Sequence, residues 1–512
     1  MTSRVDDGHR RLVPRWRYSS RVIAGFEHAG DPRDKSKFKP AFASIDPVEI
    51  AWQRDPSYVS ATDLLSAAVV MARPDLAVAP SEWLLSRQFR IPTDVMNTAR
   101  SVLTPSNPGL SERLPEQRLE VGPQDARAII ALNRQRLSEY ARSASRWMDL
   151  SLAHAVLGNR DKALRSMRTA LSIESNNRVV LRSAIRLFIH LGRAEEAFDL
   201  LRRHPRTRSD PWLLSQDISV ANILGEDPYF LNHARRLLRD ETLPAGHLTE
   251  IASAVATFES STVDLKYARK LHRLSLIAPT DNVLAQVEWL RQRDPSIPQG
   301  DSASTRGAME ANFWRTLLEG QWEPALKAVL QWQNDEPYST RPAMAGSFLL
   351  SSILADFKGA EKFAEFGLRA DPEDPLLMNN LVVAKARQFD LAEAALVFKK
   401  IRPDNRLNTF TYRATQGLMK YATGDEVGGA EDYQDSIRLA SGAEAILMVR
   451  ASWLDTQARW AKAIDQDLVK RVKADMAKLG SRVTRGVALA SLIVVEAREE
   501  SRHNPGEQPK RT

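Results

Sequence analysis

The sequence predicts an all-α fold in which pairs of helices stack into a linear array, an α-solenoid. The first observation is a recurring alanine: Ala163 and Ala197 lie 34 residues apart, Ala360 and Ala394 are again 34 apart, and Ala325 precedes Ala360 by 35. A fixed period near 34 residues is typical of one helical unit copied along a chain. The second observation is local, because apolar residues recur at helical spacing between turns that contain glycine.

The composition bounds the class of protein. With 512 residues, 43% hydrophobic and 27% charged, the chain resembles ordinary globular proteins. It has no cysteine, which excludes disulfides, cysteine-ligated metals and thiol nucleophiles. The longest apolar stretches, Ala67–Ala72 and Val487–Val495, fall short of the roughly 20 residues that a membrane span needs. We therefore expect no membrane span and a cytoplasmic location.

The positive charge is concentrated in one block. Residues 127–208 hold 17 basic and 7 acidic groups, a net charge of +10, whereas the whole chain carries +8. Such a block favours an anionic partner, either acidic protein segments or nucleic acid. Nucleic acid or an anionic surface therefore remains an alternative partner.

The N-terminal part is expected to hold two regions. Residues 1–45 are basic and contain few apolar residues, which predicts a disordered segment. Trp16 and Tyr18 lie among its arginines and could dock on a partner. Residues 46–141 read as a helical region without the repeat pattern.

Helix signals divide this second region. Asp46 and the following proline are a helix start, and Thr62 or Asp63 can cap the apolar run that Pro74 ends. Pro123 opens a longer helix.

From Trp147 onward the repeat becomes explicit. The first unit places bulky and small residues at fixed positions, namely Trp147, Leu150, Ser151, His154, Gly158, Ala163, Met167 and Ala170. The next unit follows the same plan with Leu181, Ala184, Phe188, Gly192 and Ala197. The small alanine lets the two helices of a unit approach closely.

This pattern resembles the tetratricopeptide repeat (TPR). The resemblance implies a right-handed superhelix of helix hairpins whose first helices line a concave groove. The chain departs from the family pattern at Ser175, where proline is usual, and at Phe389, where glycine is usual. We expect TPR-like blocks at 142–293 and 309–440, a flexible linker at 294–308, a helical cap at 441–500 and a disordered tail at 501–512.

One stripe of basic residues is the first candidate binding surface. Arg178, Arg182, Arg186 and His190 recur every four residues and so share one helix face. The TPR resemblance places Arg182, Arg186 and His190 on the groove side. An acidic partner would relieve their mutual repulsion. The alternative is a solvated face balanced by acids on a neighbouring helix, such as Glu195.

Three further residues are candidates for partner binding. Asn379 and Asn380 resemble asparagines with which some TPR proteins hold a peptide backbone or carboxylate, although the matching basic residues are absent. The alternative for Asn380 is a bond within the repeat. Trp314 lies near Trp322 and Trp332, which fit packing positions, and could point into the groove.

No familiar catalytic signature accompanies the repeats. The sequence contains no HExxH pair, no phosphate-binding glycine loop and no GxSxG, so no catalytic, metal or cofactor residue is predicted. We expect a non-enzymatic scaffold that binds a protein partner, an acidic segment, in the groove. Two alternatives remain open: nucleic-acid or anionic-surface binding through residues 127–208, and an unrecognised activity in the N-terminal region.

Overall fold

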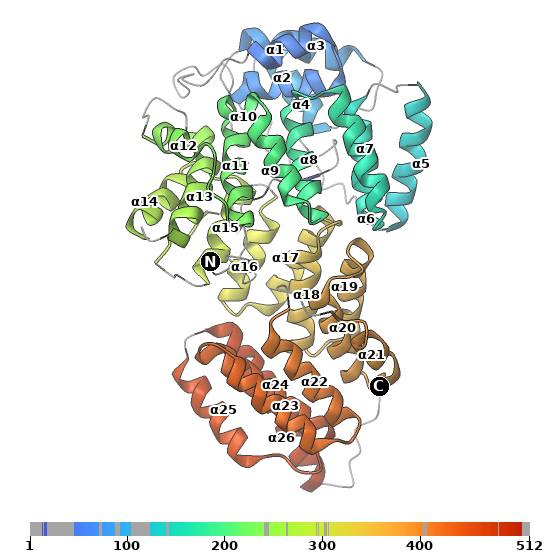
Figure 1. Ribbon diagram of the computed structural model, residues 1–512, viewed down its shortest axis with the longest axis vertical. Helices are drawn as coiled ribbons and strands as arrows, with labels where there is room; N and C mark the ends of the chain where they lie inside the picture. The colour runs from blue at the N-terminus through green and yellow to red at the C-terminus, as the bar shows by residue number, and fades with distance from the viewer. Residues whose placement is uncertain are drawn as a thin grey trace. The chain divides into compact units, whose positions relative to one another are not determined.

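The architecture is seen in a computed structural model of the chain (Figure 1). It describes residues 13, 15–17, 46–70, 74–87, 93–103, 123–139, 143–239, 245–262, 265–292, 294, 296–301, 305, 307–402, 407–479 and 481–503. Most of the segment predicted at 1–45 and most of the tail predicted at 501–512 lie outside these residues. The described residues form helices and turns without any strand, which confirms the all-α prediction.

Two compact units make up the described chain. Unit 1 holds the described residues up to Asn312 together with Asn334–Tyr338, and unit 2 holds Phe313–Gln333 and the residues from Ser339 onward. The domain boundaries drawn from the sequence stay predictions. Within the expected linker at 294–308, Ile297 is buried in a core cluster with residues such as Val283.

The first four helices of unit 1 are short and enclose their own apolar cluster. These are α1 (Asp46–Arg54), α2 (Tyr58–Val70), α3 (Pro74–Ser86) and α4 (Thr93–Leu103). The predicted cap at Thr62 or Asp63 is wrong, because α2 already begins at Tyr58. Ser57 and Ser60 cap the start of this helix. The amide of Ser60 donates to the hydroxyl of Ser57 at 3.1 Å, and the amide of Ser57 donates to the hydroxyl of Ser60 at 2.8 Å.

The rest of unit 1 is a succession of antiparallel hairpins. Its helices are α5 (Pro123–Glu139), α6 (Ala144–Val156), α7 (Arg160–Ile173), α8 (Arg178–His190), α9 (Ala194–Arg203), α10 (Arg206–Ser209), α11 (Pro211–Leu224), α12 (Leu231–Leu237), α13 (Ala245–Thr262), α14 (Leu265–Ser275) and α15 (Asp281–Arg291). Pro123 starts α5, as the sequence predicts. Consecutive helices pack in this way at α6, which contacts α7 and α8, and at α13, which contacts α14 and α15.

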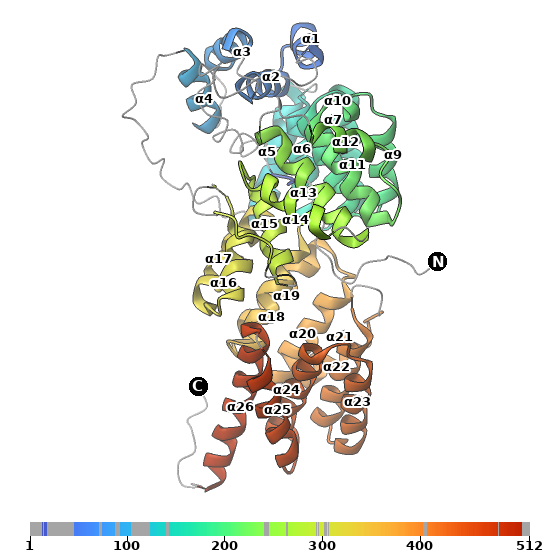
Figure 2. The same ribbon diagram turned by 90° about the vertical axis from the view of Figure 1, so that its left-hand side faces the viewer.

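The same plan continues through unit 2, whose hairpins Figure 2 shows from the side. Its helices are α16 (Met309–Leu318), α17 (Trp322–Asp335), α18 (Thr340–Ser352), α19 (Phe357–Ala370), α20 (Pro375–Arg387), α21 (Leu391–Phe398), α22 (Thr409–Ala422), α23 (Glu426–Leu439), α24 (Ala443–Trp460), α25 (Gln466–Lys478) and α26 (Arg482–His503). The first residues of α16, up to Asn312, and the last two of α17, Asn334 and Asp335, belong to unit 1. None of the described helices is long and apolar enough to cross a membrane.

The recurring alanines lie where helices cross. Ala163, Ala197, Ala325, Ala360 and Ala394 are all fully buried. A methyl side chain at these points lets two backbones approach without a void. The period of about 34 residues thus places small side chains in the packed interior of successive helix hairpins, as the repeat pattern predicts.

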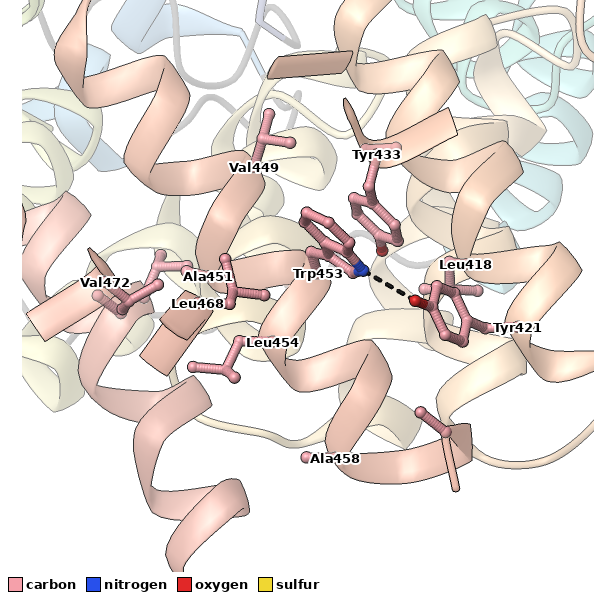
Figure 3. Close-up of a cluster of buried hydrophobic side chains, with 14 of the residues drawn as sticks. Leu418, Tyr421, Tyr433, Val449, Ala451, Trp453, Leu454, Ala458, Leu468 and Val472 are labelled. Atoms are coloured by element: carbon pink, nitrogen blue, oxygen red, sulfur yellow. Dashed lines mark hydrogen bonds between the residues drawn. The ribbon is translucent and has the colours of Figure 1, made fainter. Parts of the chain in front are cut away.

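Aromatic residues hold the C-terminal helices of unit 2 together (Figure 3). The rings of Tyr433 and Trp453 stack at 5.7 Å, and Trp453 Nε1 donates a hydrogen bond to the Tyr421 hydroxyl at 3.1 Å. Leu454 and Leu468 pack in the same cluster. Satisfied polar atoms let these large rings be buried at no hydrogen-bonding loss.

Turn positions between paired helices require a left-handed backbone. Gly192 has φ +71°, and Phe389, the residue that replaces glycine, has φ +63°. A side chain at positive φ costs roughly 1–2 kcal/mol. We expect Phe389→Gly to raise the free energy of unfolding of unit 2 by about 1 kcal/mol, because the strain is relieved. The loss of the ring contact between Phe389 and Trp460, whose centroids lie 5.9 Å apart, reduces this gain.

The opposite change at an equivalent turn, Gly192→Ala, is the control for this strain. A Cβ at Gly192 would meet no atom within 4 Å, so Gly192→Ala adds backbone strain without a clash. It should lower the free energy of unfolding by about 1 kcal/mol in urea denaturation. Equal signs for the two variants would contradict this account of the turns.

Candidate functional site

The basic stripe on α8 is positioned by a capped helix start. The side chain of Asn177 accepts from the amides of Val179 and Val180, which fixes the first turn. Arg178 Nε then lies 2.6 Å from Asp210 Oδ2. Arg182 Nη1 lies 3.1 Å from Glu250 Oε2, and both partners are largely buried. The first half of the stripe is thus neutralised within unit 1.

The second half of the stripe packs on one tyrosine. The guanidinium of Arg186 lies 5.1 Å from the ring centroid of Tyr338, and the imidazole of His190 meets the same ring edge-on at 5.4 Å. Tyr338 itself is fully buried. Glu195, the neighbouring acid weighed from the sequence, forms no ion pair with the stripe among the described residues.

A third arginine of the basic block is also buried in ion pairs. Arg206 Nη1 lies 3.2 Å from Asp63 Oδ2, and its Nε lies 3.0 Å from Asp210 Oδ2. Burial alone would raise the pKa of Asp210, but the neighbouring Arg178 and Arg206 outweigh it and lower the pKa to about 2. Asp63 therefore anchors α2 to the repeats, where the sequence suggested a helix cap.

The most unusual feature of unit 1 is a short N-terminal segment seated among the repeats. The side chain of Trp16 is fully buried, with its ring centroid 5.0 Å from that of Tyr338. The carbonyl of Val13 accepts a hydrogen bond from Asn282 Nδ2 at 2.8 Å. These residues depart from the expectation of an unpacked segment, because the indole fills an apolar cluster with Val180 and its neighbours.

The arginines on either side of Trp16 meet a cluster of four carboxylates. Arg15 Nη1 lies 2.5 Å from Glu336 Oε2, and its Nη2 lies 2.8 Å from Glu310 Oε2. Its Nε lies 3.4 Å from Asp281 Oδ2. Burial alone would lower the pKa of Arg15, but these three carboxylates outweigh it and raise the pKa. Arg15 therefore stays charged.

Arg17 forms ion pairs with two carboxylates of the same cluster, Asp281 and Asp335. Its Nε lies 3.0 and 3.1 Å from the two carboxylate oxygens of Asp335, and its Nη2 donates to Asp281 Oδ2 at 2.6 Å. Burial alone would raise the pKa of Asp281, but Arg17 and Arg15 outweigh it and lower the pKa. We call the set of Asp281, Asn282, Glu310, Asp335, Glu336 and Tyr338 the Arg–Trp–Arg site; all of it belongs to unit 1.

The candidates in unit 2 do not converge on one place. Asn380 Nδ2 donates to the Ser347 hydroxyl at 2.8 Å, which joins α20 to α18 of the preceding hairpin, whereas the sequence alternative was a bond within one repeat. Asn379 is buried, and its Oδ1 makes no hydrogen bond among the described residues. Trp314 is half-buried, with its ring 4.8 Å from Phe313 and 6.1 Å from Trp332. No clamp joins the asparagines to Trp314 in the described residues.

A buried acid on α11 yields a test of unit 1 that is independent of binding. Asp217 accepts from the Phe230 amide at 3.1 Å, and burial raises the pKa of Asp217 to about 6. As pH rises from about 4 to about 6, the unfolded chain loses this proton first, which destabilises the fold. Asp217→Asn should therefore raise the free energy of unfolding at pH 7 by about 2 kcal/mol, with the gain vanishing near pH 4.

Urea denaturation at the two pH values measures this effect. The control is Asp199→Asn on the exposed face of α9, whose carboxylate is 53% exposed, and it should change stability by less than about 0.5 kcal/mol. No gain for Asp217→Asn at pH 7 would show that its charge is tolerated in the fold.

Comparison with known proteins adds likenesses of fold only. No protein-family model and no curated protein matches the chain. Among solved structures, the human IFIT1 dimer with PPP-AAAA is 12% identical, with a TM-score of 0.37, and the match covers 73% of this chain and 95% of that one. Yeast Tom70 is 12% identical, with a TM-score of 0.30 and coverage of 75% and 97%.

A third solved structure is the APC/C hetero-tetramer Cut9–Hcn1, at 10% identity, a TM-score of 0.29 and coverage of 90% and 94%. The all-α hairpin architecture rests on the helices and buried alanines described above.

Proposed function

We propose that the chain is a non-enzymatic scaffold that binds an extended segment of another protein at the Arg–Trp–Arg site. The observation that carries this proposal is the full burial of Trp16 against Tyr338, a residue remote from it in sequence. The segment from Val13 to Arg17 is not helical where it is described. The site thus already accommodates a non-helical segment through one main-chain bond, one ring and two guanidinium groups.

The charge of the site favours a basic partner over the acidic one expected from the α8 stripe. Arg178 and Arg182 are already paired with Asp210 and Glu250. An acidic segment would have to break buried ion pairs, at a cost of several kcal/mol each, and then face four carboxylates. For the same reason Arg182→Glu would place a carboxylate against buried Glu250 and damage the fold, so it is unsuited to a binding test.

Nucleic acid through residues 127–208 gains no specific support. Three arginines of that block, Arg178, Arg182 and Arg206, are engaged in ion pairs within unit 1. The binding of phosphates needs cations that are available to solvent.

A displayed library of random peptides tests the proposal. It is panned against the full chain carrying Trp16→Ala, which weakens the hold of the resident segment. We expect selected peptides that lose binding when Asp335→Lys is added, because that change reverses one of the four charges. The matched control is Glu226→Lys, an exposed acid of unit 1 outside the site. If the library yields no peptide whose binding depends on Asp335, although circular dichroism shows both variants folded, the scaffold proposal fails.

A further inference from the structure

The charges of the Arg–Trp–Arg site are matched to a ligand with two guanidinium groups. Glu310 and Glu336 are almost fully buried, with side-chain exposures of 0% and 1%, and both bind Arg15. Asp281 is shared by Arg15 and Arg17. Removing the segment would take two guanidinium groups away from this cluster at once. Losing a charge partner of a buried carboxylate is costly, so the vacated site should favour another pair of cations.

The recognition depends on side chains rather than on this chain's backbone. Asn282 makes the one hydrogen bond to the segment's main chain that is seen among the described residues. Arg17 donates from Nε to Asp335 Oδ1 at 3.0 Å and from Nη2 to Asp335 Oδ2 at 2.7 Å, a bidentate contact that needs the planar fork of a guanidinium, which lysine lacks. Any exposed segment that presents arginine, an aromatic residue and arginine in succession can therefore make the same contacts.

The resident tryptophan is an imperfect ligand. Its Nε1 is buried and makes no hydrogen bond among the described residues. A buried donor without an acceptor opposes docking. The segment is thus held more weakly than its ion pairs alone would allow, which leaves room for a competitor.

We propose that residues 13–17 are an intramolecular ligand that a partner protein displaces with its own Arg–aromatic–Arg segment. This inference rests on the proposed function and specifies the chemistry of its partner. In the absence of the partner, the tethered segment occupies the site at a high effective concentration. Binding of the partner releases it, so that the N-terminal segment becomes exposed only in the complex.

A competition experiment tests this exchange. The probe is a fluorescein-labelled peptide with the sequence of residues 12–18, and its anisotropy is followed with the full chain, either wild-type or Trp16→Ala. We expect the peptide to bind the Trp16→Ala chain roughly tenfold or more tightly than wild-type, because the tethered competitor is weakened. A peptide with both arginines replaced by lysine should bind that chain roughly tenfold more weakly.

Two results would overturn the inference. Equal affinity for wild-type and Trp16→Ala would show that the resident segment does not compete, and equal affinity of the arginine and lysine peptides would show that guanidinium recognition is absent. If the displayed library yields peptides that depend on Asp335 but lack the Arg–aromatic–Arg pattern, the scaffold stands and this inference alone fails. A dimer that forms with rising concentration and is lost in Trp16→Ala would place the segment in a second copy, which also contradicts an intramolecular ligand.

Discussion

Reversing both charges of the N-terminal segment, Arg15→Glu with Arg17→Glu, is expected to abolish its docking. The double variant would place six carboxylates together, where four carboxylates and two guanidinium groups now lie. Breaking a buried ion pair by changing one partner costs about 3–5 kcal/mol, and here the replacement is also repelled. We expect the segment to be released completely, even though the helices of unit 1 remain folded.

The absence of native cysteine makes this release easy to follow. A single cysteine introduced by Val13→Cys carries an environment-sensitive dye, whose emission should shift to the solvent value in the double variant. The control is Arg127→Glu with Arg134→Glu, two exposed positions on α5 that change the net charge equally. An unshifted emission in the site variant would mean that the carboxylates do not hold the segment.

The second large effect is expected in unit 2, at Arg387. Its Nη2 lies 3.0 Å from Asp455 Oδ2, both side chains are 7% exposed, and its Nη1 donates to the Ser351 carbonyl at 2.6 Å. Arg459 also contacts Asp455, at 3.2 Å. Arg387→Ala leaves a buried carboxylate with one cation fewer and should lower the free energy of unfolding by about 3–5 kcal/mol. Urea denaturation measures this loss.

The pH dependence of that loss distinguishes the ion pair from lost packing. Burial alone would raise the pKa of Asp455, but Arg387 and Arg459 outweigh it and lower the pKa. An acid whose pKa is lowered by folding stabilises the fold above its unfolded value, near 4, and this stabilisation fades as pH falls further. The gap between wild-type and Arg387→Ala should therefore narrow below about pH 4. A gap that is constant with pH would indicate packing alone.

Exposed ion pairs provide the matched control for Arg387. Arg438 pairs with Asp435 within α23, and its side chain is 71% exposed. Arg438→Ala should change the free energy of unfolding by less than about 1 kcal/mol, because solvent screens such pairs. A comparable loss in both variants would contradict the role given to burial.

The fold could be predicted because the same short-range sequence signals recur in each helix hairpin. Ala163 and Ala394 mark helix crossings with a one-residue signal that recurs at a constant period, and local periodicity suffices to detect it. The spacing of Arg178, Arg182 and Arg186 likewise showed that they share a helix face. Phe389 stood out as the residue at a glycine position, and its positive φ confirms that the turn geometry persists without glycine.

The site could not be predicted, because its partners are set by packing between distant helices. Asp210 and Glu250 follow Arg178 and Arg182 by 32 and 68 residues, with no sequence signal linking them. The same holds for Arg17, whose acids lie 264 and 318 residues away. A tryptophan between two arginines was the one available hint, and composition alone assigned it to a disordered segment.

A chemical cross-link between the segment and α15 tests the central claim most directly. Val13→Cys with Asn282→Cys introduces the only two cysteines, at positions whose groups are joined by a hydrogen bond in the structure. We predict intrachain disulfide formation on mild oxidation, which is lost when Arg15→Glu and Arg17→Glu are added. A yield no greater than that of Val13→Cys paired with Arg203→Cys, an exposed position on α9, would contradict the docked segment and with it the account of the site.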